Sequence, residues 1–360
     1  AIPERYAGAD LTDKPVMVLM NGGSASASEI FAGGILGTGA GIVIGERSYG
    51  KGVAQIVYDG TNCPYLTDDA VKVTAYRFYC AGGNTSDRVG VIPTLYIPQG
   101  TASAVAQMLA GEKPTAGSAY LHLVLNGLSF YMDIAEAKQQ TPALEAVLRA
   151  LAPDAELYWG ENGTEERVTS AQVRERCGKA EMSMDLSDAS GSAYEKEINA
   201  LAAYRIVFGD KGKFRPGDTM TRAEVCALLA QALDAYSSAD GYFADVPKGS
   251  WYASSVNAMA SLGLVSGVGS GKFVPNATMT QEEFITVLGR LVEFLNLDAR
   301  AYLDEHPLAI LQPLAQYKNF SPWAIRCADL LTGSVTDESG EAVTMYCTDL
   351  EGVEPKEPIL

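Results

Sequence analysis

The sequence predicts an α/β region, a second small α/β module and a mostly helical, repetitive C-terminal part. Three observations predict this order: short apolar runs around a glycine turn, a strand–helix–strand pattern in the middle, and a motif that occurs twice in the last third. Two or three domains are expected for 360 residues. The predicted boundaries are an α/β region at 1–100, a linker at 101–117, a module at 118–180, a linker at 181–192, repeats at 193–347 and an acidic tail at 348–360.

The first region is expected to run strand, turn, helix, strand. Pro15–Met20 is a short apolar run typical of a buried strand, and Gly22 with Gly23 permits a sharp turn after it. Residues 28–36 suit a helix, and 42–45 form a second buried strand. This order places a serine-rich corner between the first strand and the helix.

Ser26 and Lys51 are the candidate catalytic pair. Ser26 lies at the expected corner, where unpaired N–H groups favour negative charge and the N–H of Ala27 is the natural oxyanion donor. A serine hydroxyl needs a base to take its proton, and both histidines, His122 and His306, lie far away in sequence. A lysine amine can serve as that base when burial keeps it neutral.

Gln55 is the expected support for the lysine. Side chains alternate along a strand, so a third strand would place Lys51, Val53 and Gln55 on one face. The Gln55 amide could then hydrogen-bond the amine and orient its lone pair. Gly50 and Gly52 are expected to leave room for a substrate backbone.

A purely structural interpretation of these residues also exists. Ser26 and Glu29 have the spacing of a capping box, in which a serine serves only to begin a helix. A lysine between two glycines is commonly a solvated loop residue. The joint pattern, rather than any one residue, favours catalysis.

Residues 15–97 resemble the carboxyl-terminal processing peptidases, also called tail-specific proteases. The resemblance implies that Ser26 is the nucleophile, Lys51 the general base and Gln55 its support. It further implies a crotonase-like α/β fold and cleavage of proteins near their C-termini through an acyl-enzyme. The resemblance rests on three blocks: Asn21-Gly-Gly-Ser-Ala-Ser-Ala-Ser-Glu-Ile30, then Ile44-Gly-Glu-Arg-Ser-Tyr-Gly-Lys-Gly52 with Gln55, and Val71-Lys-Val-Thr-Ala-Tyr76 with Gly90-Val-Ile-Pro93.

Two departures from that family are visible. Its members carry a peptide-binding PDZ module, half of the catalytic sheet and a second oxyanion donor before the serine block, so we expect this chain to be the C-terminal piece of a longer protein. The second departure is the run 79–83, where relatives usually have a proline before the glycine. That change falls in a loop and is expected to leave the chemistry intact.

The middle module is expected to be strand, helix, strand. Residues 102–110 are helix-prone, 121–134 are an expected strand, 141–151 a helix and 155–159 a strand. His122 is a single histidine on a strand, for which a structural role is the expectation. The residues of this module show no cluster that would indicate a functional site.

The repeat becomes visible after residue 195. Residues 206–224 are similar to residues 264–283, with one additional loop residue in the second copy. Each copy reads helix, glycine turn, extended Phe-x-Pro segment and a second helix. Thr221 and Thr280 are predicted N-caps, and Glu224 and Glu283 complete their capping boxes.

These copies resemble S-layer homology domains, which implies binding to anionic cell-wall polysaccharide. Arg222 is the arginine of the Thr-Arg-Ala-Glu motif that contributes to such binding, while Gln281 replaces the second one. A third, degenerate unit is expected to start at Phe320 and to lack both the Phe-x-Pro turn and the arginine motif. The alternative is that the units are only helical packing modules.

The composition excludes several classes of binding partner. The formal net charge of −17 argues against nucleic acid and anionic membrane surfaces, and no run is apolar and long enough to span a bilayer. None of the six cysteines forms a Cys-x-x-Cys pair, so no metal or other cofactor is expected. Cys63 and Cys80 are either a disulfide or two thiols, and Cys226 is expected in a helical core.

Together these patterns predict a secreted serine endopeptidase with a Ser-Lys dyad, attached to the bacterial cell wall and acting on proteins or peptides. The alternative is a non-catalytic wall-binding protein that carries an incomplete peptidase remnant. In that case the first strand would have an unpaired edge and the oxyanion hole would lack a donor.

Overall fold

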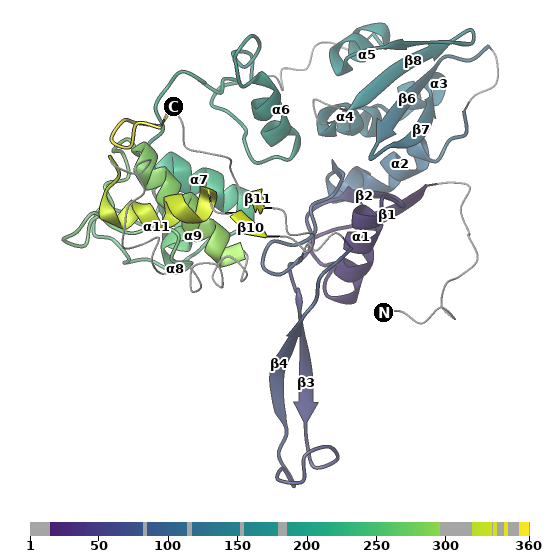
Figure 1. Ribbon diagram of the computed structural model, residues 1–360. Coiled ribbons are helices and arrows are strands. Elements are labelled where there is room, and N and C mark those ends of the chain that lie inside the picture. The colour runs from purple at the N-terminus through teal and green to yellow at the C-terminus, as the bar shows by residue number, and fades with distance from the viewer. Residues whose placement is uncertain are drawn as a thin grey trace. The chain divides into compact units, whose positions relative to one another are not determined.

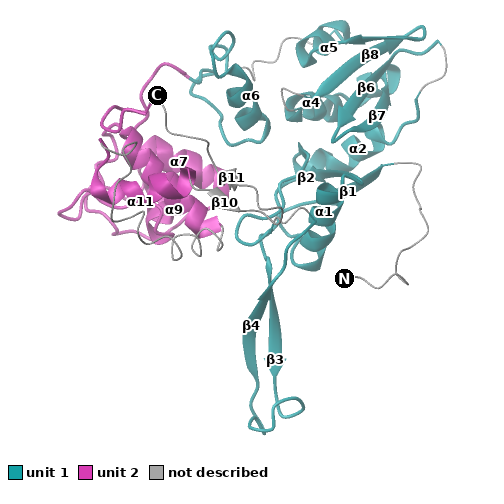
Figure 2. Ribbon diagram, in the orientation of Figure 1, with its two compact units in different colours: residues 1–214 teal, residues 215–360 magenta. Residues whose placement is uncertain are grey.

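The computed structural model is shown with its helices and strands in Figure 1. The chain divides into two compact units, residues 1–214 and 215–360, which Figure 2 distinguishes by colour. The second unit begins at Arg215, inside the region predicted to hold the repeats. The structure describes residues 15–81, 85–113, 117–151, 155–178, 186–295, 319–332, 334–336, 342–344 and 353–359.

The first unit contains a parallel sheet in the order β1-β2-β5, formed by Val16–Met20, Gly41–Gly45 and Leu95–Tyr96. Helix α1, Ala27–Thr38, connects β1 to β2 and ends at Gly39, whose φ of 67° is the left-handed conformation that favours glycine. Every residue of β2 is buried, because this strand lies between the other two. The predicted order of strand, helix and strand is confirmed.

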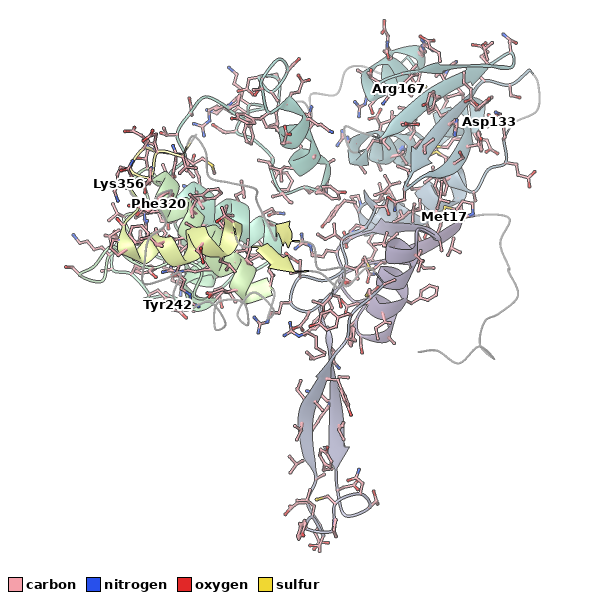
Figure 3. The ribbon with its side chains drawn as sticks, in the orientation of Figure 1. Met17, Asp133, Arg167, Tyr242, Phe320 and Lys356 are labelled. Atoms are coloured by element: carbon pink, nitrogen blue, oxygen red, sulfur yellow. The ribbon has the colours of Figure 1, made fainter. Side chains whose placement is uncertain are left out.

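Strands β3, Val53–Tyr58, and β4, Val71–Arg77, form a separate antiparallel pair. Figure 1 shows this pair leaving the sheet as a two-stranded ribbon, and Figure 3 shows side chains standing out on both of its sides. A two-stranded hairpin alone is marginally stable in water. Its base is held by the Phe78 N–H, which donates to the Gly52 carbonyl at 3.0 Å, and by an ion pair between Arg77 and Asp87 at 3.0 Å.

Helix α2, Gln99–Leu109, occupies most of the segment predicted as the linker 101–117. Its buried residues follow helical spacing and belong to the same hydrophobic core as β2, β5 and the middle sheet: Ala102, Val105, Met108 and Leu109. The helix predicted over 102–110 is therefore confirmed, whereas the linker predicted at 101–117 is wrong for residues 101–109, because this apolar helix face joins the two neighbouring parts into one core.

The middle module is an antiparallel sheet in the order β7-β6-β8-β9 with helices on one face. Alternate residues of β6, Leu121, Leu123 and Leu125, are buried against these helices, while the side chains between them lie on the opposite face. The strands are β6 Tyr120–Leu125, β7 Leu128–Asp133, β8 Glu156–Glu161 and β9 Thr164–Arg167; the helices are α3 Ile134–Gln139, α4 Thr141–Ala150 and α5 Ser170–Arg176.

The predicted single strand over 121–134 is a hairpin instead. Asn126 and Gly127 have φ values of 51° and 76°, which a two-residue type I′ turn requires, and Leu125 is paired with Leu128 across it. An Asn-Gly pair between apolar runs is a strong sequence signal for a hairpin. The prediction missed this turn because the apolar residues on both sides of the pair were interpreted as one continuous strand.

Glu165 should make the stability of this module depend on pH. A hydrogen bond from the Tyr120 hydroxyl, aided by Lys113 and His122, lowers the Glu165 pKa to about 2 from 4.5. A carboxyl whose pKa is lower in the folded state stabilises the fold above its unfolded pKa and loses that contribution as the pH falls towards 2. Between about pH 5 and about pH 2.5, a range between the two pKa values and just above them, Glu165→Gln should therefore lose less thermal stability than the unchanged chain. Equal losses in both proteins would contradict this assignment.

The repeat region is helical: α6 Glu195–Ala203 in the first unit, then α7 Arg222–Leu233, α8 Ala253–Ser261, α9 Gln281–Leu295 and α11 Pro322–Thr332 in the second, with short strands β10 Ser334–Thr336 and β11 Ala342–Thr344. Both predicted N-caps are confirmed. The Thr221 hydroxyl accepts the Glu224 N–H at 3.2 Å, and the Thr280 hydroxyl accepts the Glu283 N–H at 3.4 Å. Each glutamate accepts the N–H of its threonine in return.

The described part of the predicted acidic tail, residues 353–359, belongs to the repeat packing. The first N–H groups of α7 donate to the carbonyls of Ala277 and Pro275, and those of α9 donate to Glu357 and Pro355 in the same pattern. Residues 353–359 thus accept the first N–H groups of α9 in the same way that the Phe-x-Pro segment of the second repeat accepts those of α7. Val353-Glu-Pro355 is the corresponding turn of the third repeat, with valine in place of phenylalanine.

The three extended segments also bond to one another. The Met220 N–H donates to the Ile359 carbonyl, Ile359 to Met279, and Met279 to Met220, each at 3.0 Å. The hydrogen bonds therefore close a three-membered ring with one member from each repeat.

The predicted linker 181–192 likewise contains packed structure where it is described. Leu186 and Ala189 are buried with Ile198 of α6. The Asp188 carboxylate accepts the Phe214 N–H at 2.8 Å, as the Asp245 carboxylate accepts the Phe273 N–H at 2.8 Å. This segment is therefore the start of the first repeat.

Candidate active site

Ser26 lies at a strained corner between β1 and α1. After β1 ends at Met20, a tight turn forms in which the side chain of Asn21 accepts the Gly23 N–H and its carbonyl accepts the Ser24 N–H, both at 2.9 Å. Ser26 follows as the N-cap of α1 with φ 58° and ψ −113°, a conformation that costs free energy in a residue other than glycine. Such strain is found at functional sites, and a nucleophile on a sharp strand-to-helix turn is one known use of it.

The main-chain carbonyl of Ser26 takes up the first N–H groups of the helix. The N–H groups of Glu29 and Ile30 donate to this carbonyl at 2.9 and 3.0 Å. Ala27, the predicted oxyanion donor, is exposed at the first position of α1, where an N–H has no partner within the helix. The corner thus presents a half-buried hydroxyl beside an N–H that faces away from the helix.

Glu29 connects this corner to the lysine loop. Its side chain is completely buried, and its Oε2 accepts the N–H of Ser26 at 2.7 Å and the N–H of Lys51 at 2.9 Å. Its Oε1 accepts the Gly50 N–H at 2.7 Å and the Ser48 hydroxyl at 2.5 Å. One carboxylate therefore fixes the main chains of both predicted catalytic residues. Sequence reasoning missed this role, because the capping-box spacing signalled only the local bond to Ser26.

Lys51 is half-buried and lies in the loop before β3, which begins at Val53. The prediction of one strand face shared by Lys51, Val53 and Gln55 is wrong, because Lys51 precedes the strand and the register shifts between Ala54 and Gln55. The Gln55 amide is exposed and donates to the Thr74 hydroxyl at 3.3 Å. The main-chain N–H groups of Ser26 and Lys51 therefore share the Glu29 carboxylate, whereas Gln55 lies on the two-stranded ribbon of β3 and β4.

The two glycines beside Lys51 pack against the chain itself. A Cβ on Gly52 would lie 2.4 Å from the Asp87 backbone nitrogen, and one on Gly50 would lie 3.1 Å from Gly90. Gly50 also has a φ of 90°. These glycines therefore allow close packing of the lysine loop on residues 87–90, rather than the approach of a substrate backbone as predicted.

Cys63 and Cys80 are both free thiols, which decides between the two alternatives for this pair. Cys80 lies beside α1, where a Cβ on Gly33 would lie 2.3 Å from its sulfur. Burial, with a further contribution from Glu29, raises the pKa of Cys80. Cys226 is fully buried on α7, as predicted, and burial raises its pKa to about 12.

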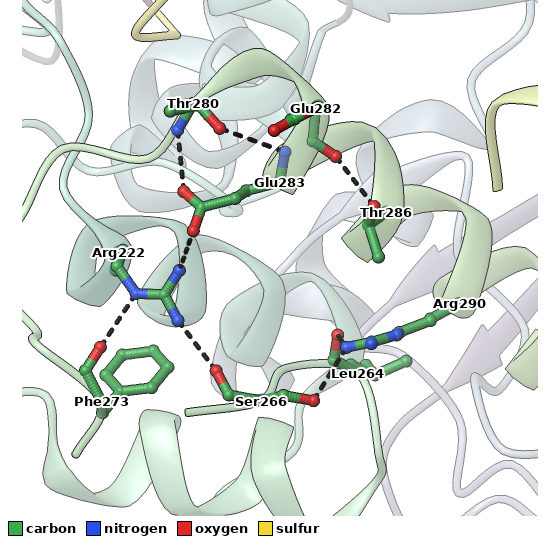
Figure 4. A network of polar contacts seen from close by, with 9 residues as sticks. All are labelled: Arg222, Leu264, Ser266, Phe273, Thr280, Glu282, Glu283, Thr286 and Arg290. Atoms are coloured by element: carbon green, nitrogen blue, oxygen red, sulfur yellow. Dashed lines mark hydrogen bonds and ion pairs between the residues drawn. The ribbon is translucent and has the colours of Figure 1, made fainter. Parts of the chain in front are cut away.

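Arg222, the predicted polysaccharide ligand, is only 6% exposed. Its three guanidinium nitrogens donate to the Phe273 carbonyl at 2.9 Å, the Ser266 carbonyl at 2.8 Å and the Glu283 carboxylate at 2.8 Å (Figure 4). The guanidinium also lies over the Phe273 ring, 4.6 Å from its centroid. The side chain thus connects the first arginine motif to the second repeat, and a polysaccharide would have to compete with Glu283 for it.

Among the described residues, no three histidine, cysteine or acidic side chains are grouped as a metal site would require. Within that same part of the chain, no helix has the length and apolar character needed to cross a bilayer.

Comparison with known proteins matches these two regions separately. Residues 3–97 match the family model of peptidase family S41, and residues 185–226 and 242–285 match that of the S-layer homology domain. The chain carries a peptidase S41 domain followed by S-layer homology domains. The start of the second match at residue 185 agrees with the packing of Leu186 and Asp188 described above.

Individual relatives fall into the same two groups. A carboxy-terminal-processing protease of Bartonella bacilliformis is 38% identical over 91 residues, which are 25% of this chain and 20% of that protein. The carboxy-terminal processing protease CtpB of Bacillus subtilis is 39% identical over 88 residues, 24% of this chain and 17% of that protein. A surface-layer 125 kDa protein of Lysinibacillus sphaericus is 28% identical over 153 residues, 42% of this chain and 12% of that protein. The chain thus spans about a fifth or less of the length of these relatives.

Proposed function

We propose that this chain is part of a serine endopeptidase of the carboxyl-terminal processing type, in which Ser26 is the nucleophile and Lys51 the general base. The single observation that carries the proposal is the Glu29 carboxylate, which holds the main chains of both residues at 2.7 and 2.9 Å. The family match to peptidase S41 and the strained backbone of Ser26 support it. A crotonase-like fold of the complete catalytic domain is part of the same proposal.

In the proposed reaction, the Ser26 hydroxyl attacks the carbonyl carbon of the scissile peptide bond and passes its proton to the Lys51 amine. The N–H of Ala27 stabilises the oxyanion, aided by the positive end of α1. Lys51 then gives the proton to the leaving amine, and water hydrolyses the acyl-enzyme by the same route. Gln55 is proposed to support Lys51 once a rotation of its side chain releases Thr74.

The test is covalent labelling of this chain with a fluorophosphonate probe, followed by peptide mapping. Label on Ser26 should be absent from Ser26→Ala and form about a hundredfold more slowly in Lys51→Ala, because a general base contributes at least this factor. Ser28→Ala, at an exposed position in the first turn of α1, is the matched control and should label like the unchanged chain. Undiminished labelling in Lys51→Ala would overturn the dyad. No label on Ser26 in the folded chain would favour the non-catalytic alternative for this part of the protein.

We further propose that the S-layer homology domains attach the secreted protein to anionic polysaccharide of the bacterial cell wall. The S-layer homology matches and the similarity to a surface-layer protein support this location. Sedimentation with purified cell walls, compared with walls stripped of their polysaccharide, tests it. Equal sedimentation with both preparations would contradict the proposed ligand.

A further inference from the structure

The face of the middle sheet opposite its helices holds a cluster of chemical groups from strands β6, β7 and β9. No described helix packs on this face, which carries the side chains of His122 on β6, Ser129 on β7 and Glu165 on β9. The exposed fraction of the side chain is 13% for His122 and 27% for Glu165, and Ser129 is exposed. The residues come from three strands and are as much as 43 positions apart, and sequence reasoning found no site here.

The imidazole bridges the other two groups. His122 Nδ1 lies 3.1 Å from Glu165 Oε2, and His122 Nε2 lies 2.9 Å from the Ser129 hydroxyl oxygen. The ring is stacked between two tyrosines, with centroid distances of 4.6 Å to Tyr131 and 5.4 Å to Tyr158. These stacks leave the imidazole little freedom to turn away from its partners.

The protonation of the cluster follows from the carboxylate. Glu165 Oε1 accepts the Tyr120 hydroxyl at 2.8 Å and the Lys113 ammonium at 3.0 Å, and these bonds help hold its pKa at about 2. Glu165 is therefore ionised near neutral pH and can only accept hydrogen bonds, so His122 Nδ1 carries the proton. In neutral imidazole the other nitrogen then has a free lone pair, so the Ser129 hydroxyl must be the donor to Nε2. This is the orientation that a general base needs.

Ser129 also brings an oxyanion donor of its own. In the two-residue hairpin, Leu125 and Leu128 flank the turn as a hydrogen-bonded pair, so Ser129 and Val124 form the next, non-hydrogen-bonded pair. Because β7 is an edge strand, the Ser129 N–H points away from β6, past the outer edge of the sheet. A nucleophilic serine whose own N–H stabilises the oxyanion is a known arrangement.

We propose that Ser129 is a second nucleophilic serine in this chain, with His122 as its general base and Glu165 as the residue that positions His122. The substrates would be small activated carboxylic esters, because an open site with one oxyanion donor suits a good leaving group better than an amide. This activity is independent of the peptidase function proposed above.

In the proposed reaction, the Ser129 oxygen forms a bond to the ester carbonyl carbon, and its proton moves to His122 Nε2. The tetrahedral intermediate collapses by breaking the bond to the leaving oxygen, which takes the proton from the imidazolium. Water then attacks the acyl-serine with His122 again as base, which releases the carboxylic acid and restores the hydroxyl.

The test uses the full chain carrying Ser26→Ala, so that the other candidate serine cannot react. Labelling with a fluorophosphonate probe and mapping by mass spectrometry should place an adduct on Ser129, with loss of fluoride. The second-order rate of labelling should fall about a hundredfold in His122→Ala. Hydrolysis of p-nitrophenyl acetate by the Ser26→Ala chain should disappear in Ser129→Ala. Ser170→Ala, on a helix of the same module, is the matched control and should change neither readout.

Glu165 is tested separately, because His122→Ala could loosen the sheet. Glu165→Gln retains a similar shape but can donate to Nδ1 and so favour the wrong tautomer, which should slow Ser129 labelling at least about tenfold. Glu165→Asp should recover part of that rate, which a purely structural role would not predict. Absence of an adduct on Ser129 in folded protein, or equal labelling rates with and without His122, would overturn the proposal.

Discussion

Replacing Glu29 by glutamine is expected to destabilise the first unit and to slow labelling of Ser26 at the same time. The buried carboxylate accepts four hydrogen bonds, three of them from the main-chain N–H groups of Ser26, Gly50 and Lys51. Glutamine keeps one oxygen and turns an NH₂ group towards donors that then lack a partner. An unsatisfied buried donor costs about 1–3 kcal/mol, so the free energy of unfolding should fall by about 2–4 kcal/mol.

The measurement is urea unfolding of Glu29→Gln beside Glu46→Gln. Glu46 lies just after β2 and accepts a long hydrogen bond from the Gln99 N–H at 3.3 Å, so its replacement should cost less than about 0.5 kcal/mol. Labelling of Ser26 is then measured in the absence of urea, at a temperature at which both variants are folded. Equal stabilities of the two variants, or unchanged labelling in Glu29→Gln, would show that the carboxylate does not hold the two loops together.

Replacing Arg222 by alanine is expected to destabilise the second unit by about 3–5 kcal/mol, since it removes one partner from a buried ion pair. Three acceptors lose their donor: the carbonyls of Phe273 and Ser266 and the carboxylate of Glu283. The Phe273 ring, fully buried, also loses the guanidinium that lies over it. Arg222→Lys should recover only part of this stability, because an ammonium cannot reach three acceptors set around a planar fork.

Arg326→Ala is the matched control. Arg326 is 47% exposed and pairs with Glu293 at the surface, so its loss should cost less than about 1 kcal/mol. Cell-wall sedimentation of folded Arg222→Lys separates the two roles of the motif arginine. Loss of binding with near-normal stability would make Arg222 a ligand, whereas loss of stability with retained binding would make it a link between repeats. An Arg222→Ala variant as stable as Arg326→Ala would contradict the structural role.

The sequence predicted correctly those elements that depend on interactions between residues close together in the chain. The apolar run before Gly22, the helix after Ser26 and the N-caps Thr221 and Thr280 all follow from the residues within one or two turns. Ser26 could likewise be placed at a helix start, because its neighbours fix that corner. The dyad assignment itself came from the family resemblance and remains a prediction.

Long-range contacts account for what the sequence did not reveal. Glu29 has a local bond that explains its spacing, so nothing in the sequence indicated its bonds to residues 48–51. The third repeat turn was concealed because Val353 stands where the other copies have phenylalanine. The group around His122 forms only when three strands pair in register, and a single histidine gives no sign of partners on other strands.

The ring of bonds among Met220, Met279 and Ile359 changes how the second unit can fold. Repeats that contact only their neighbours can fold and unfold one at a time, from either end. A closed ring removes the ends, so no repeat is free to leave without breaking two of the three bonds. During synthesis the unit must also wait until residue 359 has left the ribosome before the ring can close, because its first and last members are far apart in the chain. We therefore expect one cooperative unfolding transition for this unit, where a linear array would show gradual loss.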